Sequence, residues 1–243
     1  MKAFKNAYHL LSLARLSIIY ALRPKDVTLT FKFADHLIGL GAYSDCEKAL
    51  NAQPQAMDLI RTRERIQPVS LAELLRTPPG TLGHEFARHM IGAGLQPDFY
   101  PNIAIESDAH YVLQRLRSIH DLVHLATGYD TSEDGEIGLQ CFLMAQLRWP
   151  FAMLIVGGTI FVAPFQRGRH DFTRRMEIIV EAWRMGTSAR PVFAYDWNRA
   201  WTKPLEQVRE ELGIRPSRIF GFATPPRAAA ATRGSAPALD ISP

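Results

Sequence analysis

The chain has 243 residues, of which 47% are hydrophobic and 21% are charged, so it can bury one substantial core or two small ones. The formal net charge of +4 is small and scattered, which argues against nucleic acid as a partner and leaves an anionic membrane surface open. Two cysteines are too few for a disulfide framework and favour a reducing compartment.

The N-terminal segment predicts an amphipathic helix over about residues 7 to 22. Arg15 interrupts its apolar stretch, which argues against a secretory signal. The alternatives left open are a transit peptide and a helix docked on the protein or on a lipid surface. Alternating strand patterns are scarce, and the best of them, at 27–31, is short.

The rest of the chain predicts one helix after another, with few alternating patterns. In chain order the signals are a capping box at Ser70–Glu73, a helix from about 81 to 91, a long helix from Asp108 that ends at Gly128, a helix from near Glu136 to about Arg148, a helix capped by Asp171 and closed by Gly186, and a helix opened by Pro204 and closed by Gly213. The apolar run from 151 to 165 is shorter than the roughly 18 to 20 residues that cross a bilayer.

No long polar linker interrupts residues 1 to 220. We therefore expect an all-α fold, with a single compact multi-helix domain over residues 1–223. Residues 224–243 contain two adjacent prolines and an alanine-rich segment, and this composition predicts a disordered tail.

The strongest chemical signal is a pair of histidines, His120 and His124, followed by Glu136. Residues four apart lie on one face of a helix, so both rings can reach one ion, and Glu136 comes from the next predicted helix. With Asp121 they predict a divalent metal site between two central helices. Zinc is our first choice, and iron, manganese or cobalt remain open. Asp121 is either a ligand or a general base.

The helical wheel places the histidines at the border between an apolar stripe and a polar side. Leu116, Ile119 and Val123 form the stripe, and Arg117 and His110 lie further round with Asp121. A site at this border would be walled on one side by apolar groups and on the other by polar ones.

The signature His120-Asp121-x-x-His124, eleven residues and then Glu136 resembles that of the coenzyme Q biosynthesis protein four family. The flanks look similar too, over about residues 10 to 215. They include Gly80–Gly83, Arg115 and Arg117, Gly128, Gly135, Gly157–Gly158, Pro204–Leu205, Val208–Arg209 and Leu212–Ile214.

The resemblance implies an all-helical protein of ubiquinone biosynthesis with His120, Asp121, His124 and Glu136 as metal residues. It implies the ring step that removes the carboxylate of a polyprenylated hydroxybenzoate and installs a hydroxyl at that carbon. It further implies peripheral contact with the cytoplasmic face of a bacterial inner membrane, or with the matrix side of the mitochondrial one. The implied partners are other ubiquinone-biosynthesis proteins.

For this reaction, we expect Arg117 and His110 to orient the substrate carboxylate and Asp121 to transfer a proton. A polyprenyl tail needs an apolar channel, in which adaptable methionines and close packing at two glycines would serve. The candidates for this channel are Phe142, Met144, Phe151, Met153, Gly157 and Gly158. The same residues also fit a plain core helix pair.

Three other functions stay open. A non-catalytic lipid-binding scaffold would present quinone precursors to partner enzymes, with homodimerisation through an apolar helix face as a further option. A phosphohydrolase would use the His120-Asp121 doublet with His84, His89 or His110 upstream and Asp171 or Asp196 downstream. A metalloprotease would need glutamate at position 121.

Overall fold

We describe the protein from a computed structural model, which covers residues 2–22, 28–95, 104–163 and 171–220. The helices are α1 Lys2–Leu22, α2 Thr28–Leu40, α3 Ser44–Asn51, α4 Pro54–Thr62, α5 Leu71–Leu74, α6 Leu82–Ala93, α7 Asp108–Thr127, α8 Glu133–Leu147, α9 Pro150–Val162, α10 Phe172–Ser188, the 3₁₀ helix η2 Trp197–Arg199, and α11 Leu205–Leu212. Within these ranges there is no strand, and one isolated bridge joins Thr81 to Pro204.

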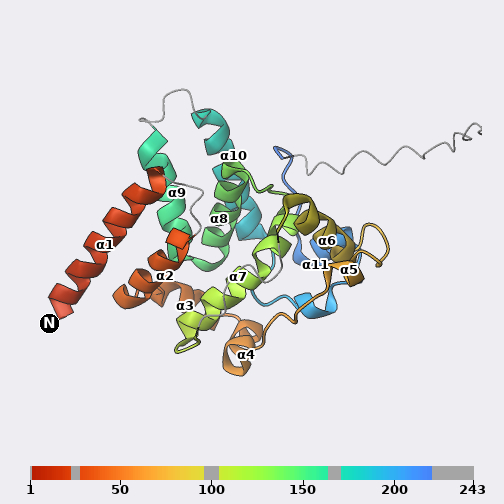
Figure 1. Cartoon of the computed structure of the whole chain (residues 1–243), viewed down its shortest axis with the longest axis horizontal. Helices are drawn as coiled ribbons and strands as arrows, with labels where there is room; N and C mark the ends of the chain where they lie inside the picture. Colours follow the sequence, from red (N-terminus) through yellow and green to blue (C-terminus); the bar gives the residue numbers. More distant parts are fainter. Residues whose placement is uncertain (1, 23–27, 96–103, 164–170, 221–243) are drawn as a thin grey trace, which may run out of the picture.

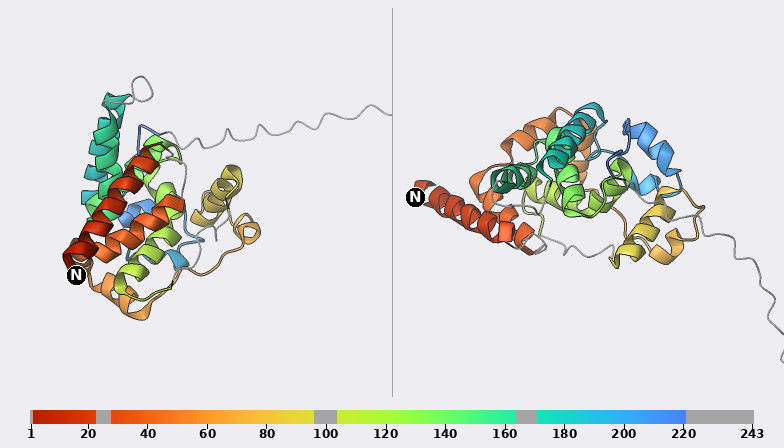
Figure 2. Two further views of the ribbon diagram at one scale, coloured as in Figure 1. Left: turned by 60° about the vertical axis from the view of Figure 1, so that its left-hand side comes forward. Right: turned by 90° about the horizontal axis from the view of Figure 1, so that it is seen from above.

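The helices form a single domain in which α7 and α8 occupy the centre. Figure 1 shows α1, α2 and α9 at one end of the molecule and α5, α6 and α11 at the other. The right-hand view in Figure 2 also shows these two groups apart. The prediction of one all-α domain is therefore confirmed for the described part of the chain.

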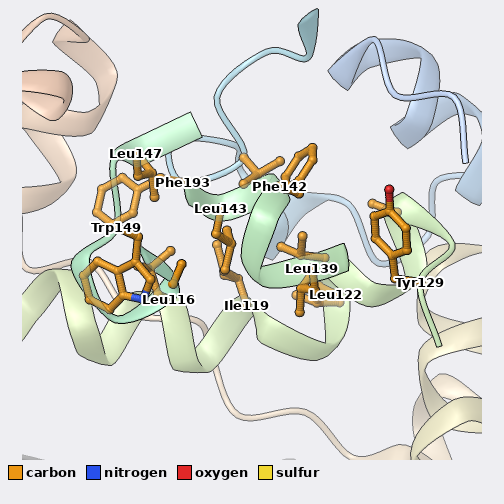
Figure 3. Close-up of a cluster of buried hydrophobic side chains, with 14 of the residues drawn as sticks. Leu116, Ile119, Leu122, Tyr129, Leu139, Phe142, Leu143, Leu147, Trp149 and Phe193 are labelled. Atoms are coloured by element: carbon orange, nitrogen blue, oxygen red, sulfur yellow. The ribbon is translucent and has the colours of Figure 1, made fainter. Parts of the chain in front are cut away.

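The long helix α7 contributes many of the buried residues of the hydrophobic core. The Ser107 side chain accepts a hydrogen bond from the His110 amide at its start, and Gly128 ends it with a left-handed φ of 77°. Fourteen of its residues are buried, as the apolar stripe and the leucines on its opposite side predict. Leu116, Ile119 and Leu122 pack against Leu139 and Leu143 of α8, as Figure 3 shows.

The closest helix contact joins α8 to α10. A Cβ added at Gly186 of α10 would lie 2.6 Å from the Phe142 carbonyl oxygen of α8. On α8 itself, a Cβ added at Gly138 would lie 2.6 Å from the ring of Tyr129, in the loop before this helix. The prediction that Gly186 closes α10 is wrong. The helix runs through it to Ser188, because Gly186 serves here as the contact point that lets two backbones approach.

The best alternating pattern of the sequence, at 27–31, does not give a strand in its described part. Residues 28–31 open α2, in which Phe33, Ala34 and Leu37 are buried at helical spacing. The Phe33 ring contacts the Phe151 ring at a centroid distance of 5.8 Å. Tertiary packing has overridden the local alternating pattern.

Other boundaries agree or shift slightly. α1 contains the predicted first helix and begins at Lys2, and α8 begins at Glu133, three residues before the predicted start. Among the described helices, none is both long and apolar enough to cross a membrane. The predicted tail at 224–243 lies outside the described residues.

Candidate metal centre

The structure brings three of the four predicted metal residues together. His120 and His124 project from one face of α7, and Glu136 comes from the first turn of α8. The His124 Nε2 atom lies 3.2 Å from His120 Nε2 and 3.1 Å from Glu136 Oε1, and His120 Nε2 lies 3.6 Å from the same oxygen. One potential ligand atom from each residue falls within 4.8 Å of the others.

The orientation of the His124 ring is set by the backbone. Its Nδ1 atom lies 2.9 Å from the carbonyl oxygen of Tyr129. A carbonyl oxygen can only accept, so Nδ1 carries a proton and Nε2 is the ring nitrogen that faces His120 and Glu136. This outer hydrogen bond is the support that metal-binding histidines commonly have.

The position of Glu136 follows from the way α8 starts. Ser132 caps the helix by accepting a hydrogen bond from the Gly135 amide, and Asp130 accepts bonds from both the amide and the hydroxyl of Ser132. Gly135 is required because a Cβ there would lie 2.0 Å from the Asp130 carbonyl oxygen. Glu136 therefore enters the site from the positive end of the α8 dipole.

The three residues of the cluster influence one another's ionisation. Burial alone would raise the pKa of Glu136, but His120 and His124 outweigh it and hold the pKa far below its usual range. Burial would lower the pKa of His120, and the Glu136 carboxylate outweighs it and raises that pKa. Two imidazoles and an ionised carboxylate form a donor set that suits a divalent ion.

Asp121 is not part of the three-residue cluster. It is half-buried on α7 and interacts electrostatically with His89 of α6, which also lies near both cluster histidines. Burial lowers the pKa of His89, with a smaller opposing effect from Asp121. Sequence spacing did not predict that His89 would lie near His120 and His124, because it lies more than 30 positions upstream of His124 on a separate helix.

Arg117 and His110 are on α7 but at different distances from His120 along the helix axis. Arg117 is three residues before His120, about one turn away, and its charge acts on Tyr43, which directly precedes α3. His110 is ten residues before His120, about 15 Å along the axis, and its Nδ1 lies 2.8 Å from the Ser107 hydroxyl. Of these two residues, Arg117 is the nearer to His120 along the helix axis.

The residues predicted to line a lipid channel differ in burial. Phe142 is fully buried in the core and Met144 is partly buried against it. Phe151 packs on Phe33, and Met153 is 43% exposed. The predicted close packing at Gly157 and Gly158 is wrong, since both are exposed and no described atom lies within 4 Å of a Cβ added at either.

The comparison with protein families gives a clear result. The family described as "Coenzyme Q (ubiquinone) biosynthesis protein Coq4" matches residues 4–218. The chain belongs to the Coq4 family. It is thus a member of a family of ubiquinone biosynthesis proteins, and the resemblance seen in the sequence is confirmed over nearly the whole chain.

Individual Coq4 relatives agree with this assignment. A Nematostella vectensis protein named "Ubiquinone biosynthesis protein COQ4 homolog, mitochondrial" is 30% identical over 176 residues, which cover 70% of this chain and 83% of that protein. A Homo sapiens protein of the same name is 30% identical over 72% of this chain and 67% of its own length. The chain covers 59% of a similar Botryotinia fuckeliana protein.

A solved Coq4-like structure shows the same fold. The crystal structure of a Nostoc punctiforme PCC 73102 protein named for ubiquinone biosynthesis superposes with a TM-score of 0.74 at 29% identity. The match covers 86% of this chain and 97% of that one.

The phosphohydrolase hypothesis loses support from the geometry. Its downstream aspartates would be Asp171 and Asp196, and these cap α10 and η2 by accepting backbone hydrogen bonds. Neither joins the cluster, in which Glu136 takes the remaining place.

Proposed function

We propose that this chain is a metal-dependent enzyme that oxidatively decarboxylates a polyprenylated hydroxybenzoate. The observation that carries the proposal is the cluster of His120, His124 and Glu136, in a protein of a ubiquinone biosynthesis family. Three protein ligands leave coordination positions open, which is typical of catalytic sites, whereas structural zinc sites usually have four.

The cluster residues would hold a divalent ion, with zinc as our first choice and iron, manganese or cobalt as alternatives. A bound ion would stabilise negative charge on the phenolate or carboxylate oxygen of the head group. In the overall reaction, the bond from the ring to the carboxyl carbon breaks, CO2 leaves, and the ring carbon gains oxygen from dioxygen. One dioxygen per ring balances release of CO2 and water with the ring at the quinone level, and two electrons and two protons from an external two-electron donor, such as a reduced nicotinamide or flavin, then give the hydroxyl. Because zinc has no redox chemistry, the dioxygen step would need a redox-active ion in the cluster or direct reaction of the ring with dioxygen.

The neighbouring side chains have separate roles in this proposal. Arg117 can clamp the substrate carboxylate, since a guanidinium pairs with it through two hydrogen bonds. Asp121 stands beside the cluster and outside it, so we assign proton transfer to it rather than ligation. His110 could reach only a more distant part of the substrate, because it lies about three helical turns from His120.

Exposed apolar groups on two neighbouring helices support contact with a membrane. On α1, Phe4, Tyr8, Leu11 and Ile18 are 62–85% exposed, and on α9 Phe161 is 74% exposed. The two helices lie side by side. We propose that this face contacts the cytoplasmic face of a bacterial inner membrane, or the matrix side of the mitochondrial one, and that the prenyl tail enters from there.

The second candidate is the lipid-binding scaffold, and the same exposed surface favours it. A scaffold would present quinone precursors to other ubiquinone-biosynthesis proteins, with or without forming a homodimer through an apolar helix face. In that case the metal would have no part in turnover.

One experiment separates the two candidates. Wild type and His124→Ala are purified, their metal content is measured, and both are assayed for loss of the carboxyl group from a prenylated hydroxybenzoate in the presence of dioxygen. Joint loss of metal and decarboxylation supports the enzyme. Turnover that is unaffected by the substitution, or metal without turnover, overturns it in favour of the scaffold.

A further inference from the structure

A second concave site lies apart from the metal cluster, between the C-terminal half of α10 and the segment that follows α11. Its volume is about 700 Å³, within the range of small-molecule sites. It is lined by Glu181, Arg184, Met185, Ser188, Gly213, Arg215, Pro216 and Arg218.

The charge of this cleft is strongly positive. Arg184, Arg215 and Arg218 are exposed. Among the described residues, none of the three forms an ion pair with a carboxylate, whereas Arg175 on the same helix as Arg184 pairs with Asp134. Guanidinium groups that share a concave surface repel one another when nothing neutralises them. An anion bound among them would remove this repulsion.

The acidic residue in the wall does not neutralise the arginines. Glu181 accepts hydrogen bonds from the Ser217 hydroxyl at 2.6 Å, the Arg218 amide at 3.2 Å and the Tyr129 hydroxyl at 3.3 Å. The Glu181 carboxylate is therefore occupied by neutral donors, which connect α10 to the segment after α11. Three positive side chains remain against this one negative group.

Both walls are held in place before any ligand arrives. The Ser217 amide donates to the Thr127 carbonyl oxygen at 2.8 Å, and Pro216 packs against Gly128, where an added Cβ would lie 3.0 Å from the proline Cβ. The other wall belongs to α10, which packs closely on α8 through Gly186. A site with fixed walls loses little conformational entropy on binding.

From the cleft's shape and charge we propose that it binds a phosphorylated small molecule. Phosphate carries up to two charges and three peripheral oxygens, which guanidinium forks match better than a single carboxylate would. The buried Met185 and the partly buried Pro216 offer an apolar surface for the rest of the ligand. The cleft volume of about 700 Å³ fits a small molecule, and we therefore favour one over an acidic protein.

The test uses inorganic pyrophosphate as the probe and phenylglyoxal, which modifies arginine, as the reporter. At constant ionic strength, pyrophosphate should slow modification of Arg184, Arg215 and Arg218 at least fivefold, as measured by peptide mass spectrometry. Three exposed arginines elsewhere, Arg61, Arg76 and Arg199, serve as internal controls and should change less than twofold.

Affinity is measured on matched triple variants. Replacing the three cleft arginines by glutamine should weaken pyrophosphate binding at least tenfold, while the same replacement at Arg61, Arg76 and Arg199 should leave it within twofold. These sites lie outside the metal cluster, so metal content should be unchanged in both. Equal protection at all six arginines, equal loss in both variants, or protection by an acidic peptide but not by pyrophosphate would overturn the proposal.

Discussion

The ring of His124 is oriented by the backbone of Tyr129, whose carbonyl oxygen lies 2.9 Å from Nδ1. His124 is fully buried, and this bond fixes which nitrogen faces Glu136. The loop that supplies the carbonyl begins at Gly128, whose positive φ turns the chain back after α7. The turn between the helices thus helps to orient the candidate metal-binding cluster.

Glu136→Gln should weaken metal binding at least tenfold. The substitution keeps the size of the side chain but removes the negative charge that faces both histidines. Metal affinity is measured by competition with a chelator of known affinity. Glu133→Gln, in the same helical turn but paired with Arg175, is the matched control and should change affinity less than threefold. Equal effects of the two substitutions would contradict the assignment of Glu136 as a ligand.

Two glycine substitutions should have opposite effects on stability. Gly186→Ala should destabilise the protein by about 1–3 kcal/mol, because the new Cβ meets the backbone of α8. Gly157→Ala should stabilise it by about 0.5–1 kcal/mol, because a helix-interior glycine gains a better helix former with open space around it. Urea unfolding measures both. Destabilisation by Gly157→Ala would mean that α9 has a close neighbour at this point.

Acid should weaken the contact between α1 and α2. The Nδ1 atoms of His9 and His36 lie 3.0 Å apart, and burial, followed by the charge of His9, lowers the pKa of His36 against the smaller opposing effect of Asp35. Because the folded pKa lies below the unfolded one, the unfolded chain binds more protons as pH falls below about 6.5, so stability decreases there.

The measurement for this contact is thermal unfolding between pH 7.5 and 5. Wild type should lose more stability over this range than His36→Gln, which cannot take up the proton. The metal histidines are present in both proteins, so their titration cancels in the comparison. Parallel pH profiles of the two proteins would show that the His9–His36 contact does not contribute to the pH dependence of stability.

Arg115→Met should destabilise the protein by about 1–3 kcal/mol for each backbone carbonyl that loses its partner. The buried guanidinium donates to the carbonyl oxygens of Phe193 and Tyr195 at 2.7 and 3.1 Å, which ties the loop before η2 to α7. Arg88→Met, whose salt bridge with Glu85 is more exposed, should cost less than about 1 kcal/mol. Chemical denaturation compares the two, and a smaller loss for Arg115→Met would contradict this role.

The sequence by itself determined the helical class, the main helix ends and the three residues of the metal cluster. Capping at Ser107, the stop at Gly128 and the four-residue spacing of the histidines act through local geometry, which the chain order carries directly. Glu136 was predictable too, because it follows a short loop after α7 and the start of α8 therefore lies near the C-terminal end of α7, where His124 stands.

The tertiary structure alone decided which other residues meet at the sites. His89 joins the neighbourhood of the cluster from a distant helix, and Asp121 stands outside the cluster although it is next to His120. Gly186 continues a helix that its residue type predicted it would end, and residues 28–31 became helical despite their alternation. Each outcome depends on packing between segments far apart in the sequence, where the free energy of burial exceeds local backbone preference.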